Sequence, residues 1–185
     1  NGFNGEDGDS GYNIDSSNGI RSARPSLKVN GDRSPSLCGR FAWSPMLGTE
    51  FGFSAWNGPW DIDGDLDLTI TVIDLTTDLS SLIEALGPTE LEIEIGDVGI
   101  DVDADAIAAE VPEKLTANSI QISRRFFPSA IENLFGDESS CGLTARFEEE
   151  DLGVAVKTRS TVGFNIRPTD ETILKFDYEQ EQIEN

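Results

Sequence analysis

The sequence predicts an all-β protein: an antiparallel up-and-down meander of about eight strands that forms part of a transmembrane β-barrel, with short helical turns at one end. Three observations support this fold class. Runs of alternating apolar and polar residues recur from Ser36 onward, and such alternation gives a strand one apolar and one polar face. No apolar run approaches the length of a membrane helix. Compact turns alternate with longer, mostly acidic loops, as in outer-membrane barrels.

The elements follow one another at regular spacing. Residues 1–35 are rich in Gly, Asn, Asp and Ser, and we expect an external loop region there. Residues 36–181 would form the barrel portion, and residues 182–185 a polar tail. The expected strands cover residues 36–44, 50–56, 66–76, 89–95, 116–126 and 140–150, followed by a closing hairpin within residues 158–180.

Two helical turns interrupt the strands. Residues 78–87 and 129–136 have helical spacing of apolar residues, and a glycine ends each segment. Each segment carries a Ser/Glu pair that predicts a capping box, Ser81 with Glu84 and Ser129 with Glu132. Residues 96–113 form an acidic stretch that we interpret as a long loop, with a helical turn over residues 105–109.

The closing hairpin shows the alternation most clearly. Val162, Phe164 and Ile166 share one face of its first strand, and Leu174, Phe176 and Tyr178 share one face of its second. Residues 168–171 (PTDE) provide the turn, because proline cannot continue the strand pairing and Asp can bond its own backbone. A half-buried hairpin in a soluble sheet would show the same pattern, so alternation alone does not identify a membrane strand.

Composition narrows the range of functions. The 185 residues are enough for one domain and do not require two. Thirty-five acidic residues against 13 basic ones give a net charge of -22 with no histidine, which argues against binding to nucleic acid phosphates. The charge fits a solvated acidic surface, a high-salt habitat or loops that bind cations. The hydrophobic share of 37% is low for a soluble core of this length and suits a sheet with one apolar face.

The cysteines and the first residues give weaker information. Cys38 and Cys141 could form a disulfide or stay unpaired, so they do not fix the compartment. The given sequence has no signal peptide and begins at Asn1 within a loop-like stretch. We therefore expect a fragment of a longer chain.

Four segments resemble the C-terminal half of Gram-negative outer-membrane porins, and the phosphate-selective porin-like group is the nearest. They are GRFAWSPMLGTEFGFSAWNGPWD (39–61), RRFFPSAIENLFGDESS (124–140), LTARFEEEDL (143–152) and TVGFNIRPTDETILKFDYE (161–179). The resemblance covers most of residues 36–180 and consists of turn signatures. The chain departs from the family at its end, QEQIEN, where such porins finish on an aromatic residue.

The resemblance implies a bacterial outer-membrane porin, here a partial one, that acts as a passive diffusion channel for ion transport. Its partners would be the lipid bilayer and small charged or polar solutes, with anions such as phosphate among them. The resemblance also allows assembly into a homotrimer. Because charge facing lipid is costly at mid-bilayer, we expect Arg124 and Glu149 to lie near the ends of their strands.

The charged residues of the strands are the candidate site. On the pore hypothesis, these side chains line the lumen and set up a transverse field. The alternative is that they pair across neighbouring strands and have only a structural role. The candidates are Arg40, Glu50, Glu92, Arg125, Arg146, Arg167, Lys175 and Asp177.

Metal binding and catalysis receive less support. Asp61, Asp63 and Asp65 stand at alternate positions, a spacing that could hold Ca²⁺ in a loop, although we favour solvated acids because an EF-hand needs a glycine and a distal glutamate that are missing. No cofactor is expected otherwise. Without histidine or any nucleophile or phosphate-loop motif, we expect no enzyme. A glycosidase-like site with two carboxylates about 5–10 Å apart is the weakest hypothesis.

The main alternative to the porin is a soluble, secreted acidic β-domain that binds cations or glycans. The two hypotheses differ in what one predicted apolar face contacts, lipid or a protein core. That face would carry Phe41, Phe53, Leu68, Ile93, Val162 and Phe176.

Overall fold

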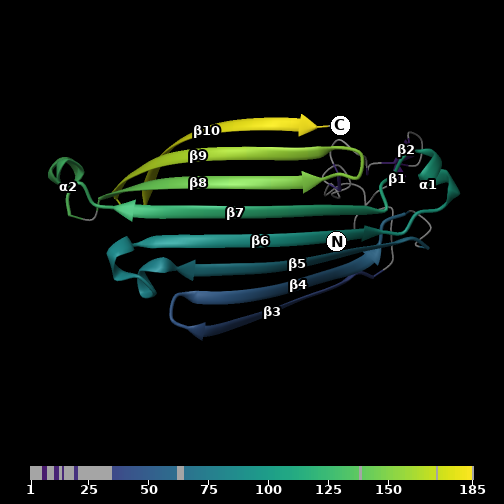
Figure 1. The fold of residues 1–185 in the computed structure, drawn as a ribbon, viewed down its shortest axis with the longest axis horizontal. Coiled ribbons are helices and arrows are strands. Elements are labelled where there is room, and N and C mark those ends of the chain that lie inside the picture. Colours follow the sequence, from purple (N-terminus) through teal and green to yellow (C-terminus); the bar gives the residue numbers. More distant parts are fainter. Residues whose placement is uncertain are drawn as a thin grey trace.

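The structure, a computed structural model, describes residues 6–7, 11–12, 14, 19–20, 35–61, 65–137, 139–169 and 171–184. Eight strands form one antiparallel sheet in which neighbours in the chain are neighbours in space. The predicted up-and-down meander is therefore confirmed (Figure 1). The strands are β3 (Leu37–Met46), β4 (Thr49–Pro59), β5 (Asp67–Asp78), β6 (Thr89–Ile100), β7 (Lys114–Phe126), β8 (Ser140–Asp151), β9 (Val156–Thr169) and β10 (Thr172–Glu184). A separate pair of short strands, β1 (Glu6–Asp7) and β2 (Gly11–Tyr12), lies near one end of the sheet.

The connections are sorted between the two ends of the sheet as expected (Figure 1). One end, here called the turn end, holds the β3–β4 turn, the β5–β6 connection, α2 (Ser129–Phe135) and the β9–β10 turn. The opposite end, the loop end, holds the β4–β5 loop, α1 (Ala104–Ala108) and the β8–β9 loop. Among the described residues, no helix combines the length and apolar character needed to cross a membrane.

The helical turns differ from the predictions in their details. The predicted helix over residues 78–87 is two 3-10 turns, η1 (Leu79–Ser81) and η2 (Glu84–Leu86), and the Asp78 carboxylate caps the first by accepting a hydrogen bond from the Ser80 amide. The predicted capping box of Ser81 with Glu84 is therefore wrong. The helix α2 forms as predicted, but Pro128 is its N-cap residue and no side chain caps it. Ser129 thus begins the helix, and its predicted capping box is wrong as well.

Several strands are longer than predicted. β6 continues to Ile100, so residues 96–100 are strand where a loop was expected. β10 continues to Glu184, through most of the predicted polar tail. Pro168 lies within β9 and not in the turn, and the β9–β10 register shifts just opposite it, between Thr172 and Leu174. Proline is tolerated at such a register shift because it has no backbone N–H to donate to the neighbouring strand.

The strand register sorts the side chains onto two faces. Paired residues of an antiparallel sheet share a face, so the register defines each face across all eight strands. One side, the charged face, carries Arg40, Glu50, Asp74, Glu90, Glu92, Glu94, Arg125, Arg146, Glu148, Lys157, Arg159, Arg167, Lys175, Asp177, Glu179 and Glu181.

The opposite face carries a continuous band of apolar side chains. This apolar band consists of Phe41, Trp43, Phe51, Phe53, Ala55, Ile73, Leu75, Leu91, Ile93, Ile95, Ile120, Ile122, Leu143, Ala145, Phe147, Val162, Phe164, Ile166, Leu174, Phe176 and Tyr178. Many of its side chains are exposed, Phe41 by 67% and Phe176 by 62%. Trp43 and Phe51 stack on neighbouring strands with ring centroids 5.9 Å apart.

The buried core is small and lies at the loop end. Trp60, Leu68, Ile100 and Leu115 belong to it, together with Ile14 from the segment before the sheet. Leu68 is fully buried and pairs with Ile100, which places it on the charged-face side of the sheet. Its predicted place beside Phe41 and Phe53 is therefore wrong. In β5 the apolar band is formed by Ile73 and Leu75 instead.

Candidate functional site

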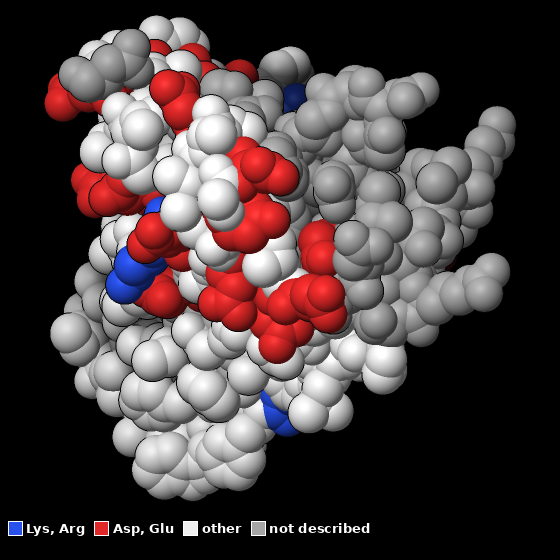
Figure 2. All heavy atoms as spheres, turned by 90° about the vertical axis from the view of Figure 1, so that its right-hand side faces the viewer, with Lys and Arg blue, Asp and Glu red and all other residues white. Residues whose placement is uncertain are grey.

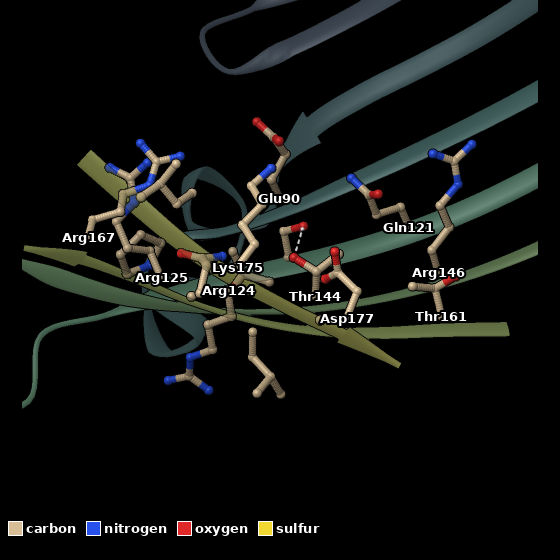
Figure 3. A pocket seen from close by; sticks show the side chains of 18 of the residues that line it. Glu90, Gln121, Arg124, Arg125, Thr144, Arg146, Thr161, Arg167, Lys175 and Asp177 are labelled. Atoms are coloured by element: carbon tan, nitrogen blue, oxygen red, sulfur yellow. Dashed lines mark hydrogen bonds between the residues drawn. The ribbon is translucent and has the colours of Figure 1, made fainter. Parts of the chain in front are cut away.

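All eight predicted lining residues lie on the charged face. The register places Arg40, Glu50, Glu92, Arg125, Arg146, Arg167, Lys175 and Asp177 on this one side of the sheet. The face is hollowed between β5 and β10 by a cavity of about 720 Å³. In Figure 3 the side chains of Arg125 and Arg167 lie at one end of this cavity and those of Gln121 and Arg146 at the other. The candidates therefore share one polar surface.

The first group of charges on this face is paired across β3, β4 and β5. Arg40 Nη1 and Nη2 donate to the two carboxylate oxygens of Asp74 at 2.6 and 2.7 Å. Arg40 Nη2 also donates to Glu50 Oε1 at 3.3 Å. The two-point contact with Asp74 matches the geometry in which guanidinium and carboxylate groups bind most strongly. These three residues therefore pair across neighbouring strands.

A second paired group spans β8, β9 and β10 and is centred on Arg159. Its guanidinium lies 3.0 Å from Glu181 Oε2, 3.3 Å from Glu179 Oε1 and 3.6 Å from Glu148 Oε2. Two further cations complete the group, since Lys157 Nζ lies 3.1 Å from Glu181 and Arg146 Nη2 lies 2.8 Å from Glu148. The sequence reasoning missed Arg159 and Lys157. Both have the same strand parity as Arg167, so the alternation in β9 would have identified them.

Three cations on the charged face have no ion-pair partner among the described residues: Arg125, Arg167 and Lys175. They cluster because of the register, which aligns Lys175 with Asn165, Asn165 with Gly142 and Gly142 with Arg125. Arg167 lies two residues beyond Asn165 on the same strand. These three side chains form the cationic cluster near the turn end of the cavity (Figure 3).

Carboxylates line the neighbouring part of the same face. Glu90, Glu92 and Glu94 occupy alternate positions of β6 and point to the charged face. Gln121 Nε2 donates to Glu92 Oε2 at 2.8 Å, while none of the three acids forms an ion pair with a described residue. The acids of β6 and the cationic cluster on β7, β9 and β10 produce a field across the hollow, and Asp177 of β10 adds a further acid that has no ion-pair partner among the described residues. Such a field orients and selects small charged solutes in a water-filled passage.

The apolar band crosses the strands at an angle. Phe53, the middle of the band in β4, shares a row of register partners with Ile73, Ile95, Asn118, Glu149, Thr158 and Gln182. In β10 the middle of the band is Phe176, six residues before Gln182. The band therefore shifts six residues over the six steps from β4 to β10. A shift of one residue per strand corresponds to a strand tilt of about 36° in an eight-stranded barrel.

On the face that carries the apolar band, the length of strand without a charged side chain varies from strand to strand. In β8 it runs from Cys141 to Phe147, about 20 Å, and in β9 from Val156 to Ile166, about 34 Å, at roughly 3.4 Å per residue. The apolar band of an outer-membrane barrel is about 25 Å tall. Arg124 and Glu149 share this face but lie beyond the apolar band on opposite sides, Arg124 towards the turn end and Glu149 towards the loop end. This is the placement expected from the sequence.

Acidic side chains gather at the loop end. Figure 2 views this end and shows many more Asp and Glu side chains than Lys and Arg. Asp101, Asp105 and Glu110 are exposed there. Within the described part of the chain, no group of three or more acidic or cysteine side chains is arranged to hold a metal ion.

The predicted calcium ligands lie in the β4–β5 loop. Asp63 falls outside the described residues. Asp61 is buried, and its two carboxylate oxygens accept hydrogen bonds from the backbone amides of Asp65 at 3.2 Å and Leu66 at 3.0 Å. Asp61 therefore holds the loop together.

Comparison of the chain with protein-family models, with curated proteins and with solved structures gave no match.

Proposed function

We propose that this chain forms part of the wall of an outer-membrane β-barrel and provides a passive diffusion path for small charged or polar solutes, with no chemical step. One observation carries the proposal: the apolar band is exposed across all eight strands, whereas the opposite face is charged and hollowed. Water-soluble sheets bury their apolar face, and outer-membrane barrels turn it towards lipid.

The size of the exposed band supports this environment. Monomeric soluble proteins rarely expose a continuous apolar patch of more than a few hundred square ångströms. Here large side chains such as Trp43 on β3, Ile95 on β6 and Val162 on β9 are each more than half exposed. The shift of the band by one residue per strand also supports tilted strands, because a band level with a bilayer must cross such strands obliquely.

The side chains of the charged face support small charged solutes as the class that would pass. The cationic cluster of Arg125, Arg167 and Lys175 would attract anions, phosphate among them, as they pass the turn end. Glu90, Glu92 and Glu94 and the acidic loop end would attract cations. With a chain charge of -22, we expect weak rather than strict anion selectivity.

The second candidate function is a secreted acidic β-domain that binds cations or glycans. The core around Trp60 favours it, because Ile14 and Leu115 pack there as in a soluble domain. Among the described residues, that core covers the loop end of the sheet and leaves the apolar band exposed. A soluble domain would therefore need a further layer over the apolar band.

Detergent dependence of folding tests the proposal. The chain is refolded with and without detergent micelles, and far-UV circular dichroism and heat-modified gel mobility are recorded. We expect strand signal and a heat-sensitive mobility shift only with detergent, and conductance steps after insertion into planar bilayers. A cooperative, monodisperse β fold in plain buffer would reject the channel and favour the soluble domain.

A further inference from the structure

The cavity on the charged face contains two neighbouring rows of residues that run across the strands. The register places in the first row Lys175, Asn165, Gly142 and Arg125. Two residues nearer the loop end on each strand, the second row contains Asp177, Gly163, Thr144, Ser123 and Glu90. Two residues of a strand span about 7 Å. Cations and carboxylates therefore stand in adjacent rows of one cavity.

The second row is acidic at both ends and carries hydroxyl groups between them. A Cβ at Gly163 would collide with an Asp177 carboxylate oxygen, so the Asp177 side chain reaches inward over β9. The Ser123 and Thr144 hydroxyls share a hydrogen bond of 3.0 Å in the middle of the row. Figure 3 shows the same order along the cavity, with Arg125 and Arg167 first, then Glu90, Thr144 and Asp177.

The charges of the two rows do not neutralise each other through direct contacts. Within the described part of the chain, Arg125, Arg167, Glu90 and Asp177 form no ion pair. Glu90 pairs with Ser123, so Arg125 is its diagonal neighbour, a position that long side chains can reach. The Arg125 side chain lies instead beside Arg167 at one end of the cavity (Figure 3). Both signs of charge therefore remain available to a solute.

The position of these charges does not depend on what lies beyond the two edges of the sheet. Glu90, Arg125 and Arg167 belong to β6, β7 and β9, which have a paired strand on each side. Asp177 belongs to the edge strand β10, but its carboxylate lies over β9. A further strand next to β3 or β10 would leave this arrangement in place.

We propose that this part of the cavity binds small zwitterions, namely amino acids and related compounds with one ammonium and one carboxylate group. The inference rests on the proposed channel function and names a solute class within it. The solute carboxylate accepts hydrogen bonds from Arg125 and Arg167, whose guanidinium groups match the geometry of a carboxylate. The solute ammonium donates to Glu90 or Asp177, since an ionised carboxylate is an acceptor only.

A solute with a single charge fits the same surface less well. An anion held at Arg125 and Arg167 would lie within about 7 Å of the acidic row and be repelled by it. A cation held at Glu90 would be repelled in the same way by the cationic cluster. A zwitterion places each of its charges beside the opposite one. The cavity volume of about 720 Å³ lies in the range of small-molecule sites, and a channel site must bind weakly enough for release.

Three solutes of nearly equal shape test the proposal. β-Alanine carries both charges, butyrate has a methyl group in place of the ammonium, and β-alaninamide has a neutral amide in place of the carboxylate. Their binding to the chain refolded in detergent micelles is measured at neutral pH by saturation-transfer difference NMR. We expect β-alanine to bind about tenfold more tightly than either of the others, the change expected for one charge-assisted contact. In planar bilayers, β-alanine should reduce the ion current most at equal concentration.

Single variants assign each charge of the solute to its row. Arg125→Gln should weaken binding of β-alanine about tenfold and leave that of β-alaninamide unchanged, because only the first carries a carboxylate. Glu90→Gln should weaken binding of β-alanine and strengthen that of butyrate, since the acid no longer repels an anion. Glu94→Gln is the matched control, because Glu94 lies on the same face of β6 but is not among the residues that line the cavity. It should leave all three affinities unchanged.

The solute comparison on the unmodified chain needs no variant, so the test holds even if a variant fails to fold. Equal binding of β-alanine and butyrate would overturn the zwitterion site and leave a site for simple anions. Absence of binding by all three solutes to a chain that conducts ions would reject the site and leave the channel function. Selective binding of β-alanine by a chain that gives no conductance would support the site and reject the channel function.

Discussion

At the scale of single residues, glycines let polar side chains cross the charged face. A Cβ at Gly52 would collide with the Asp74 carboxylate and the Arg40 guanidinium, and one at Gly163 would collide with the Asp177 carboxylate. A glycine inside a strand commonly marks such a close approach. The absence of a side chain at Gly52 is therefore what allows Arg40 to span three strands.

Paired and unpaired cations on the charged face should differ in their effect on stability. Arg159→Gln leaves Glu148, Glu179 and Glu181 without their shared partner, and we expect it to lower the free energy of unfolding by about 1 kcal/mol, as for partly exposed ion pairs. Arg167→Gln removes a cation that pairs with no described carboxylate, and its effect should stay within about 0.5 kcal/mol. Urea unfolding in detergent micelles measures both values, and equal losses would contradict the distinction.

At the scale of elements, alternation predicts some strands fully and others only in part. In β9 and β10 each apolar residue alternates with a polar one, so their faces could be assigned from the sequence. In β5, Leu68, Ile70 and Val72 occupy one face while Ile73 and Leu75 occupy the other. Ile14 and Trp60 cover the Leu68 end of the first face. Because these residues come from distant segments, local periodicity could not indicate which face would be buried.

The candidate site, too, could be predicted from the sequence only in part. Strand parity placed all eight predicted residues on one face, since parity is a property of each strand alone. Which charges pair depends on the register between strands, and a shift of two residues would change every partner while leaving parity unchanged. The contrast between Arg40, which is paired, and Arg125, which is not, could therefore not be predicted.

A charge placed within the apolar band should be far more costly than one at its border. Ala145 and Glu149 lie on the same face of β8, the first inside the apolar band and the second beyond it. We expect Ala145→Arg to destabilise the folded, lipid-inserted protein by about 2–4 kcal/mol and Glu149→Arg by about 0–1 kcal/mol. Folding titrations in lipid vesicles measure the two free energies. Similar values for both variants would mean that the apolar band does not face hydrocarbon.

At the scale of the whole molecule, acidic side chains gather at the loop end, and the cationic cluster lies apart from them in the cavity. The loop end carries exposed acids such as Asp101 and Glu110 (Figure 2), while the cationic cluster lies in the cavity near the turn end (Figure 3). In the proposed channel, a solute that enters from the loop end would meet negative potential first and positive potential later. Because exposed charges are screened more strongly by salt than partly buried ones, the balance between these regions depends on ionic strength.

Ion selectivity should therefore change with salt concentration. At about 0.1 M salt the screening length is about 10 Å, so the acidic loop end concentrates cations at that end of the channel. At about 1 M salt the screening length falls to about 3 Å, and the cationic cluster then acts on ions in direct contact with it. We expect the anion-to-cation permeability ratio, from reversal potentials across planar bilayers, to rise between these two concentrations. Combining Arg125→Gln, Arg167→Gln and Lys175→Gln should lower the ratio at about 1 M salt and so reduce the rise, because these three cations then no longer act on anions in direct contact. Replacing Asp101 and Glu110 by their amides is the matched control, which should raise the ratio at low salt and leave the high-salt value unchanged. A ratio that is independent of salt in the unmodified protein would show that these two charged regions do not lie along the conducting path.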